Sequence, residues 1–108
     1  MDVTPEDLHE LMQQPGPRPF RLIDVREEDE FSICKLDWAE LIPLAQLSAE
    51  APRRLIDKDK PLVVYCHHGM RSSWAANWLR GMGYENVFNL TGGIDAWAQR
   101  VDSSMARY

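Results

Sequence analysis

The residues best suited to chemistry form one short segment that begins at a cysteine. It reads Cys66-His67-His68-Gly69-Met70-Arg71-Ser72 and lies between an apolar run, residues 62–65, and a predicted helix. At such a junction the backbone N–H groups can curl around the sulfur as an anion-binding nest. Helix N-termini and nearby cations favour the thiolate, which is the nucleophilic form, and Gly69 lets the loop close tightly. We therefore predict a nucleophilic Cys66 in an anion-binding loop.

Arg71 is the cation of this loop. Its guanidinium fork matches paired oxygens, so we predict that it binds the anionic end of a substrate, with a surface salt bridge as the alternative. His67 and His68 beside Cys66 also suggest a metal site. Structural zinc takes four ligands, and neither His9 nor Cys34 shows ligand spacing, so we predict no metal and no cofactor. The histidine rings either tune anion attraction and acceptor fit or fill an exposed loop.

Composition and charge exclude several classes of function. The net charge is -5 and no dense Lys/Arg run occurs, so nucleic acid is not an expected partner. The apolar run is far too short to span a bilayer, and residues 1–7 lack the order of a signal peptide. Two cysteines are too few for a disulfide framework, which fits a reducing compartment. We therefore expect a cytoplasmic protein without a membrane segment, in which Cys34 either resolves an oxidised Cys66 or takes no part.

Hydrophobic spacing predicts the elements that must position the loop. At 108 residues and 44% hydrophobic content the chain suits one domain, 1–108, with its core over about 3–100 and a loose tail over 102–108. Strands are predicted over 20–25, 40–43, 62–65 and 87–90. Helices are predicted over 5–14, near 27–31, from 44 to an end or restart at Pro52, over 72–82, and from 93 through 97.

This alternation of strands and helices predicts an α/β fold. Its central parallel sheet has about five short strands and is flanked by helices on both faces. Ligands of such sheets bind beyond the carboxyl ends of the strands. Those ends carry Asp24 and Arg26, Pro43, Cys66, and the segment Thr91-Gly92-Gly93.

The combined pattern resembles the rhodanese family, whose active loop runs Cys-x-x-Gly-x-Arg/Ser/Thr and holds a cysteine persulfide. Three further segments match its motifs: Leu22-Ile23-Asp24-Val25-Arg26, Glu30-Phe31 through Ile42-Pro43, and Leu90-Thr91-Gly92-Gly93-Ile94-Asp95-Ala96-Trp97. The resemblance implies that Cys66 is the sulfur carrier and that residues 67 to 71 form its cradle. It also implies that Asp24, Arg26, Gly92 and Gly93 support the site, with Asp24 bonded to local N–H groups or to Arg26.

One segment departs from this pattern. Where the family commonly has Gly-His-Ile-x-Gly-Ala, this chain has Cys34-Lys35-Leu36-Asp37-Trp38-Ala39. Without the two glycines we expect the turn to take a different backbone path, which would reshape one wall of the site.

The resemblance implies a thiosulfate sulfurtransferase-type enzyme. In its reaction Cys66 takes sulfur from thiosulfate or a persulfide and passes it to cyanide, a thiol or a protein acceptor. Related phosphatases and arsenate reductases place five residues between Cys and Arg, whereas this loop has four, which suits a sulfur atom better than a phosphate. A non-catalytic binding module is the other alternative, and the presence of Cys66 disfavours it. No motif indicates a particular acceptor or an oligomeric state.

Overall fold

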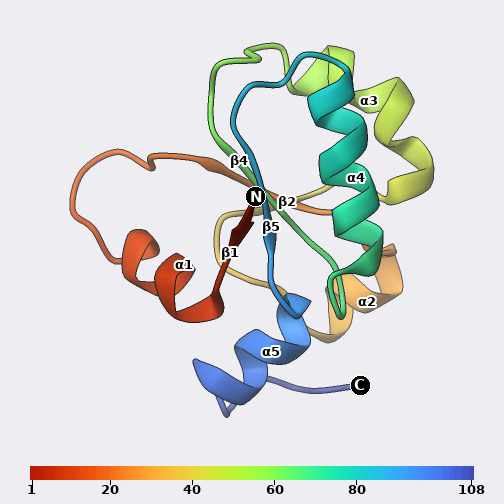
Figure 1. Cartoon of the computed structure of the whole chain (residues 1–108). Helices are drawn as coiled ribbons and strands as arrows, with labels where there is room; N and C mark the ends of the chain where they lie inside the picture. The colour runs from red at the N-terminus through yellow and green to blue at the C-terminus, as the bar shows by residue number, and fades with distance from the viewer.

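A single five-stranded sheet organises the computed structural model, which describes residues 1–108 (Figure 1). All strand pairs are parallel, and the spatial order is β1-β5-β4-β2-β3, which puts β4 in the centre. The strands are β1 (Asp2–Val3), β2 (Arg21–Asp24), β3 (Ala39–Leu41), β4 (Leu62–Tyr65) and β5 (Val87–Leu90). The helices are α1 (Pro5–Met12), α2 (Glu28–Ile33), α3 (Leu47–Arg54), α4 (Met70–Gly81) and α5 (Gly93–Arg100), with a 3-10 turn, η1 (Leu44–Gln46), before α3.

Alternate residues of the buried strands point to opposite faces, so the sheet carries two apolar layers. On one face Ile23 and Val64 pack with side chains of α3 and α4. On the other face Leu22 and Val63 pack with side chains of α1 and α5. The predicted α/β fold with helices on both faces of a parallel sheet is confirmed.

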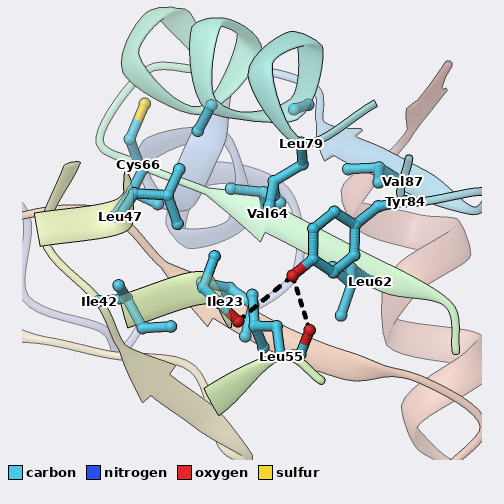
Figure 2. Close-up of a cluster of buried hydrophobic side chains, with 14 residues drawn as sticks. Ile23, Ile42, Leu47, Leu55, Leu62, Val64, Cys66, Leu79, Tyr84 and Val87 are labelled. Carbon is cyan, nitrogen blue, oxygen red and sulfur yellow. Dashed lines mark hydrogen bonds between the residues drawn. The ribbon is translucent and has the colours of Figure 1, made fainter. Parts of the chain in front are cut away.

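Figure 2 shows the α3–α4 layer, with Cys66 at one end of it beside α4. At the other end the Tyr84 hydroxyl donates to the carbonyl oxygens of Leu55, at 2.6 Å, and Ala51, at 3.2 Å. The Tyr84 end of the layer is thus hydrogen-bonded, and Cys66 joins the core to the loop that follows β4.

Local sequence signals account for the start of α1 but not for the end of α3. Thr4 caps α1 by accepting a hydrogen bond from the Asp7 N–H at 3.1 Å, and Pro5 occupies the first helical position. The sequence predicted that the helix would end or restart at Pro52. Helix α3 instead continues through Pro52 to Arg54. The Leu55 N–H still bonds to the Ala51 carbonyl at 2.8 Å.

Three further differences concern segments at or near element ends. Helix α4 begins at Met70, two residues earlier than predicted, and β1 has no counterpart in the sequence prediction. The tail also differs from the predicted loose segment. Met105 packs against the α1–α5 layer, and Tyr108 reaches α2, where its hydroxyl donates to Glu30. Figure 1 shows the tail running from α5 toward α2. No helix has the length and apolar character that a membrane crossing requires.

Candidate active site

Cys66 follows the central strand and is buried, with 1% of its surface exposed. Its Sγ accepts hydrogen bonds from the Gly69 N–H at 3.1 Å, the Ser72 N–H at 3.4 Å and the Ser72 Oγ at 3.4 Å. Gly69 stands immediately before α4 with φ 110°, a conformation that favours glycine. The sequence predicted a nest of backbone N–H groups, and the structure places two of them, plus a hydroxyl, on the sulfur.

Asn89, which the sequence did not single out, holds this loop from β5. The Ser72 Oγ donates to Asn89 Oδ1 at 2.5 Å, and Asn89 Nδ2 donates to the Gly69 carbonyl at 3.3 Å. A hydroxyl has one proton to donate. When the Ser72 hydroxyl donates to Asn89 Oδ1, its oxygen can accept a hydrogen bond from a Cys66 thiol. When Cys66 is a thiolate, the hydroxyl can donate to the sulfur instead. The pair therefore suits both protonation states of the sulfur.

Gly92 and Gly93 pack directly behind the loop, at the start of α5. A Cβ on Gly93 would lie 2.5 Å from the Cys66 carbonyl oxygen and would also collide with that of His67. The next two N–H groups, of Ile94 and Asp95, donate to these same carbonyls at 2.9 and 3.0 Å. At Gly92 a Cβ would meet the Cβ of Ala96 at 2.6 Å. Both glycines also have positive φ, so the close contact and the backbone conformation require the same residue type.

Asp24 and Arg26 form a fully buried ion pair at the end of β2. Asp24 Oδ2 accepts from Arg26 Nη2 at 2.7 Å, and Asp24 Oδ1 accepts from the Arg26 N–H at 2.9 Å. Burial opposes the charge of Arg26, yet its hydrogen bonds with Asp24 and Tyr108 outweigh this effect and raise its pKa. Arg26 Nη2 also donates to the Cys34 carbonyl at 2.6 Å, so the pair ties β2 to the segment after α2.

Arg71 does not point a free guanidinium at the loop. Its Nη1 and Nη2 donate to the two carboxylate oxygens of Glu30, at 2.7 and 2.9 Å. The hydrogen bond from Arg71 is the main reason why the pKa of Glu30 falls to about 2. Of the two expectations for Arg71, the structure contains the ion pair.

The two histidines of the loop differ in their surroundings. The His67 ring stacks on Tyr108 with centroids 3.9 Å apart and planes 7° apart, and its Nε2 is buried without a partner. Burial, assisted by His68, lowers the pKa of His67, so the ring is neutral near pH 7. The His68 side chain is 65% exposed, with Nδ1 3.9 Å from Asp95. No group of three or more His, Cys, Asp or Glu side chains has an arrangement suited to a metal ion.

Comparisons with known proteins identify the family of this chain. The family model for the rhodanese-like domain matches residues 4–100. The chain belongs to the rhodanese-like domain family.

Individual relatives agree with this assignment. The chain is 35% identical over 98 residues to the thiosulfate sulfurtransferase GlpE of Haemophilus influenzae, covering 91% of this chain and 88% of that protein. It is 39% identical over 110 residues to the chloroplastic rhodanese-like/PpiC domain-containing protein 12 of Arabidopsis thaliana. That match covers 99% of this chain but spans only 37% of the Arabidopsis protein. The crystal structure of a rhodanese-like domain protein from Staphylococcus aureus shares the fold, with a TM-score of 0.80 and 23% identity over 100% of this chain and 99% of that one.

The segment that departs from the rhodanese pattern, residues 34–39, keeps one backbone conformation that favours glycine. Trp38, which stands where the family commonly has its second glycine, adopts φ 74°. The turn was expected to avoid this conformation once the glycine was lost. Instead, the Trp38 ring packs against Phe20, with ring centroids 5.5 Å apart. The guanidinium carbon of Arg18 lies over the Trp38 ring, 4.9 Å from its centroid. Such a conformation costs a non-glycine residue about 1–3 kcal/mol, which this packing must offset.

Trp38 also lines a cavity of about 370 Å³ between α1, α5 and this turn, away from the Cys66 loop. The Trp38 end of the departing segment therefore shapes this cavity, whereas its Cys34 end contacts Arg26 of the site. Cys34 belongs to the α1–α5 layer, whereas Cys66 belongs to the α3–α4 layer, and both thiols are free. The two cysteines thus pack in different layers, so the structure gives no support to a Cys34–Cys66 disulfide.

Three contributors to the site were missed by sequence reasoning. Asn89 could have been noticed as the one polar residue in the buried strand 87–90. Glu30 was expected only as part of a short helix near 27–31, and its pairing with Arg71 joins residues that are far apart in the sequence. Tyr108 gave no signal, because its contacts lie 78 and 82 residues away in the sequence.

Proposed function

We propose that this rhodanese-like domain is a sulfurtransferase that carries sulfane sulfur as a persulfide on Cys66. The observation that carries the proposal is the set of three donors within 3.4 Å of a buried sulfur, two backbone N–H groups and one hydroxyl. Donors fixed in this way stabilise negative charge without having to reorganise during the reaction. The thiosulfate sulfurtransferase GlpE, a relative over nearly its whole length, supports the same chemistry.

In the first step the Cys66 thiolate attacks the outer sulfur of a donor. With thiosulfate, the bond between the two sulfurs of the donor breaks, its electron pair leaves with sulfite, and the transferred sulfur becomes the terminal atom of a Cys66 persulfide. No proton from a general acid is needed, which agrees with a loop in which the pKa of the half-buried His67 is lowered. Met70 and Arg71 contribute the first backbone amides of α4, and in this proposal those amides help to hold the terminal sulfur.

In the second step a thiophilic acceptor attacks that terminal sulfur. Cyanide, a small thiol or a protein thiolate takes the sulfur, and the electron pair of the broken bond returns to Cys66 as thiolate. The mechanism is a double displacement. Cys66 is its one catalytic residue, and residues 67 to 72 surround the transferred sulfur. Asp24, Arg26, Gly92 and Gly93 act through the shape of the loop rather than on the sulfur itself.

Intact-mass measurement tests the proposal directly. The protein is incubated with thiosulfate or cysteine persulfide, freed of donor and weighed. Wild type and a Cys34→Ser variant should each gain one sulfur atom that cyanide removes, whereas Cys66→Ser should gain none. Cys34→Ser is the matched control, because it removes the other thiol of the chain. Sulfur retained by Cys66→Ser, or wild type that stays unmodified with both donors, would overturn the proposal.

A further inference from the structure

The carboxylate of Glu30 has all of its strong hydrogen-bonding positions occupied beside the Cys66 loop. Oε1 accepts from Arg71 Nη1 at 2.7 Å and from the Glu27 N–H at 3.0 Å. Oε2 accepts from Arg71 Nη2 at 2.9 Å and from the Tyr108 hydroxyl at 2.8 Å. The Glu30 side chain is only 15% exposed. A carboxylate bound in this way holds Arg71 in a bidentate pair and competes with any anion for the same guanidinium.

Tyr108 fixes this arrangement from the far end of the chain. Its hydroxyl accepts a hydrogen bond from Arg26 Nη1 at 2.8 Å while donating to Glu30, so it joins the two ion pairs of the site. Burial raises the pKa of Tyr108 to about 12, which keeps the phenol a neutral donor. Its ring lies flat on His67, with centroids 3.9 Å apart. The phenol is therefore held at both its ring and its hydroxyl.

The charges around the loop consequently cancel. Arg71 is neutralised by Glu30, and Arg26 is neutralised by Asp24. The exposed acids on either side of the α2 start, residues 27–29, add negative charge next to Glu30, and the whole chain carries -5. A dianionic donor approaching the Cys66 thiolate meets no unpaired arginine and must displace Glu30 to reach Arg71. Local charge of this kind changes association with charged substrates by about tenfold or more.

We infer that Glu30, positioned by Tyr108, determines donor selectivity by withholding Arg71, so that the loop prefers a thiol persulfide to thiosulfate. The inference rests on the proposed function. In the preferred reaction the Cys66 thiolate attacks the outer sulfur of R–S–SH. The donor's S–S bond breaks, its electron pair leaves on the thiolate R–S⁻, and the transferred sulfur keeps its proton in the Cys66 persulfide. No sulfonate has to be accommodated, so the Arg71–Glu30 pair can remain closed throughout.

The test compares kcat/KM for thiosulfate with kcat/KM for cysteine persulfide, whose carrier amino acid has no net charge. Glu30→Gln should raise the thiosulfate-to-persulfide ratio about tenfold at low salt, mainly through a lower thiosulfate KM, and less at high salt. Glu28→Gln is the matched control, because it removes one exposed carboxylate from the same helix. Its ratio should change by less than about twofold.

Tyr108→Phe provides a second, milder variant. It keeps the ring on His67 and deletes both hydrogen bonds of the hydroxyl, so the ratio should rise about threefold, with Ser103→Ala of the same exposed tail as control. If Glu30→Gln does not fold, Tyr108→Phe decides the question by the same ratio.

Three results would overturn the inference: an unchanged ratio in Glu30→Gln, an equal rise in Glu28→Gln, or, where Tyr108→Phe decides, an unchanged ratio in that variant. In each case sulfur still loads onto wild-type Cys66, so the proposed function stands. Wild type that accepts sulfur from neither donor would remove both.

Discussion

The two sides of the Cys66 site are built in different ways. The inner wall, formed by residues 66–72 with Asn89 and Gly93, bonds the sulfur through backbone N–H groups and a hydroxyl that sit within six residues of the cysteine. The outer wall, formed by Arg26, Glu30, Arg71 and Tyr108, consists of side-chain pairs between α2, α4 and the tail. Backbone donors fix the position of the sulfur, whereas side-chain pairs set the charge that a substrate meets.

This difference separates chemistry from selectivity. A backbone cradle changes little when a surface side chain is replaced, because its donors belong to the loop and the first turn of α4. An ion-pair wall can be altered at one residue without moving the sulfur. We expect changes in the inner wall to alter every sulfur transfer alike, and changes in the outer wall to alter one donor relative to another.

The largest expected effect is a loss of stability when the buried Asp24–Arg26 ion pair, which supports the outer wall, is broken. Arg26→Met leaves Asp24 buried without its partner and should lower the free energy of unfolding by about 3–5 kcal/mol. Replacing both residues, Asp24→Leu with Arg26→Met, should recover at least half of this loss, because no isolated charge remains. Chemical denaturation of the two variants measures the difference. A double variant no more stable than Arg26→Met would contradict the assignment of the cost to an unpaired charge.

Gly93→Ala should break the inner wall by pushing on the loop carbonyls. The added Cβ collides with the Cys66 and His67 backbone, and φ 64° is unfavourable for alanine, so stability should fall by about 3 kcal/mol. Sulfur loading should slow with both donors. Gly81→Ala is the control, because its Cβ would meet nothing within 4 Å and should cost no stability. Equal melting temperatures for the two variants would show that the close approach at Gly93 has no energetic importance.

Asn89→Ala tests whether the inner wall depends on the strand behind it. The change removes an acceptor from Ser72 and a donor from Gly69, both buried, and should cost about 2 kcal/mol. The loading rate should fall about tenfold with either donor while their ratio stays constant. Asn86→Ala, which removes an exposed amide near the start of the same strand, should leave the rate close to wild type. A selective loss with one donor would assign Asn89 to the outer wall instead.

The smallest expected effect is a pH dependence of stability that belongs to Glu30. The pKa of Glu30 falls from 4.5 to about 2 on folding, so below pH 4.5 the unfolded chain binds more protons than the folded one. Stability from the Arg71 pair is therefore complete above pH 4.5 and is lost as the pH falls toward 2. The contribution should be about 1 kcal/mol, because the pair is partly exposed. Denaturation curves of wild type and Glu28→Gln should share this slope, and Glu30→Gln should lack it.

Much of the fold and the inner wall could be predicted because their signals are local. An apolar run followed by Cys-x-x-Gly and a helix start specifies a strand, a loop and a ring of free N–H groups within a dozen residues. Thr4 and Pro5 specify the start of α1 in the same way. The alternation of strands and helices then restricts the sheet to a parallel arrangement, which brings residue 24, Cys66 and the glycine pair to one edge.

The outer wall was decided only by the tertiary structure. Glu30, Arg71 and Tyr108 are ordinary surface residue types in the sequence, and nothing near them specifies a partner 41 or 78 residues away. Their pairing depends on how α2, α4 and the tail converge beyond β4, and that convergence follows from packing of the whole core. The sequence by itself determined which sulfur is cradled and by what kind of donor, because backbone geometry is a short-range property. The structure decided which charge faces the substrate, because ion pairs form between segments that only the fold brings together.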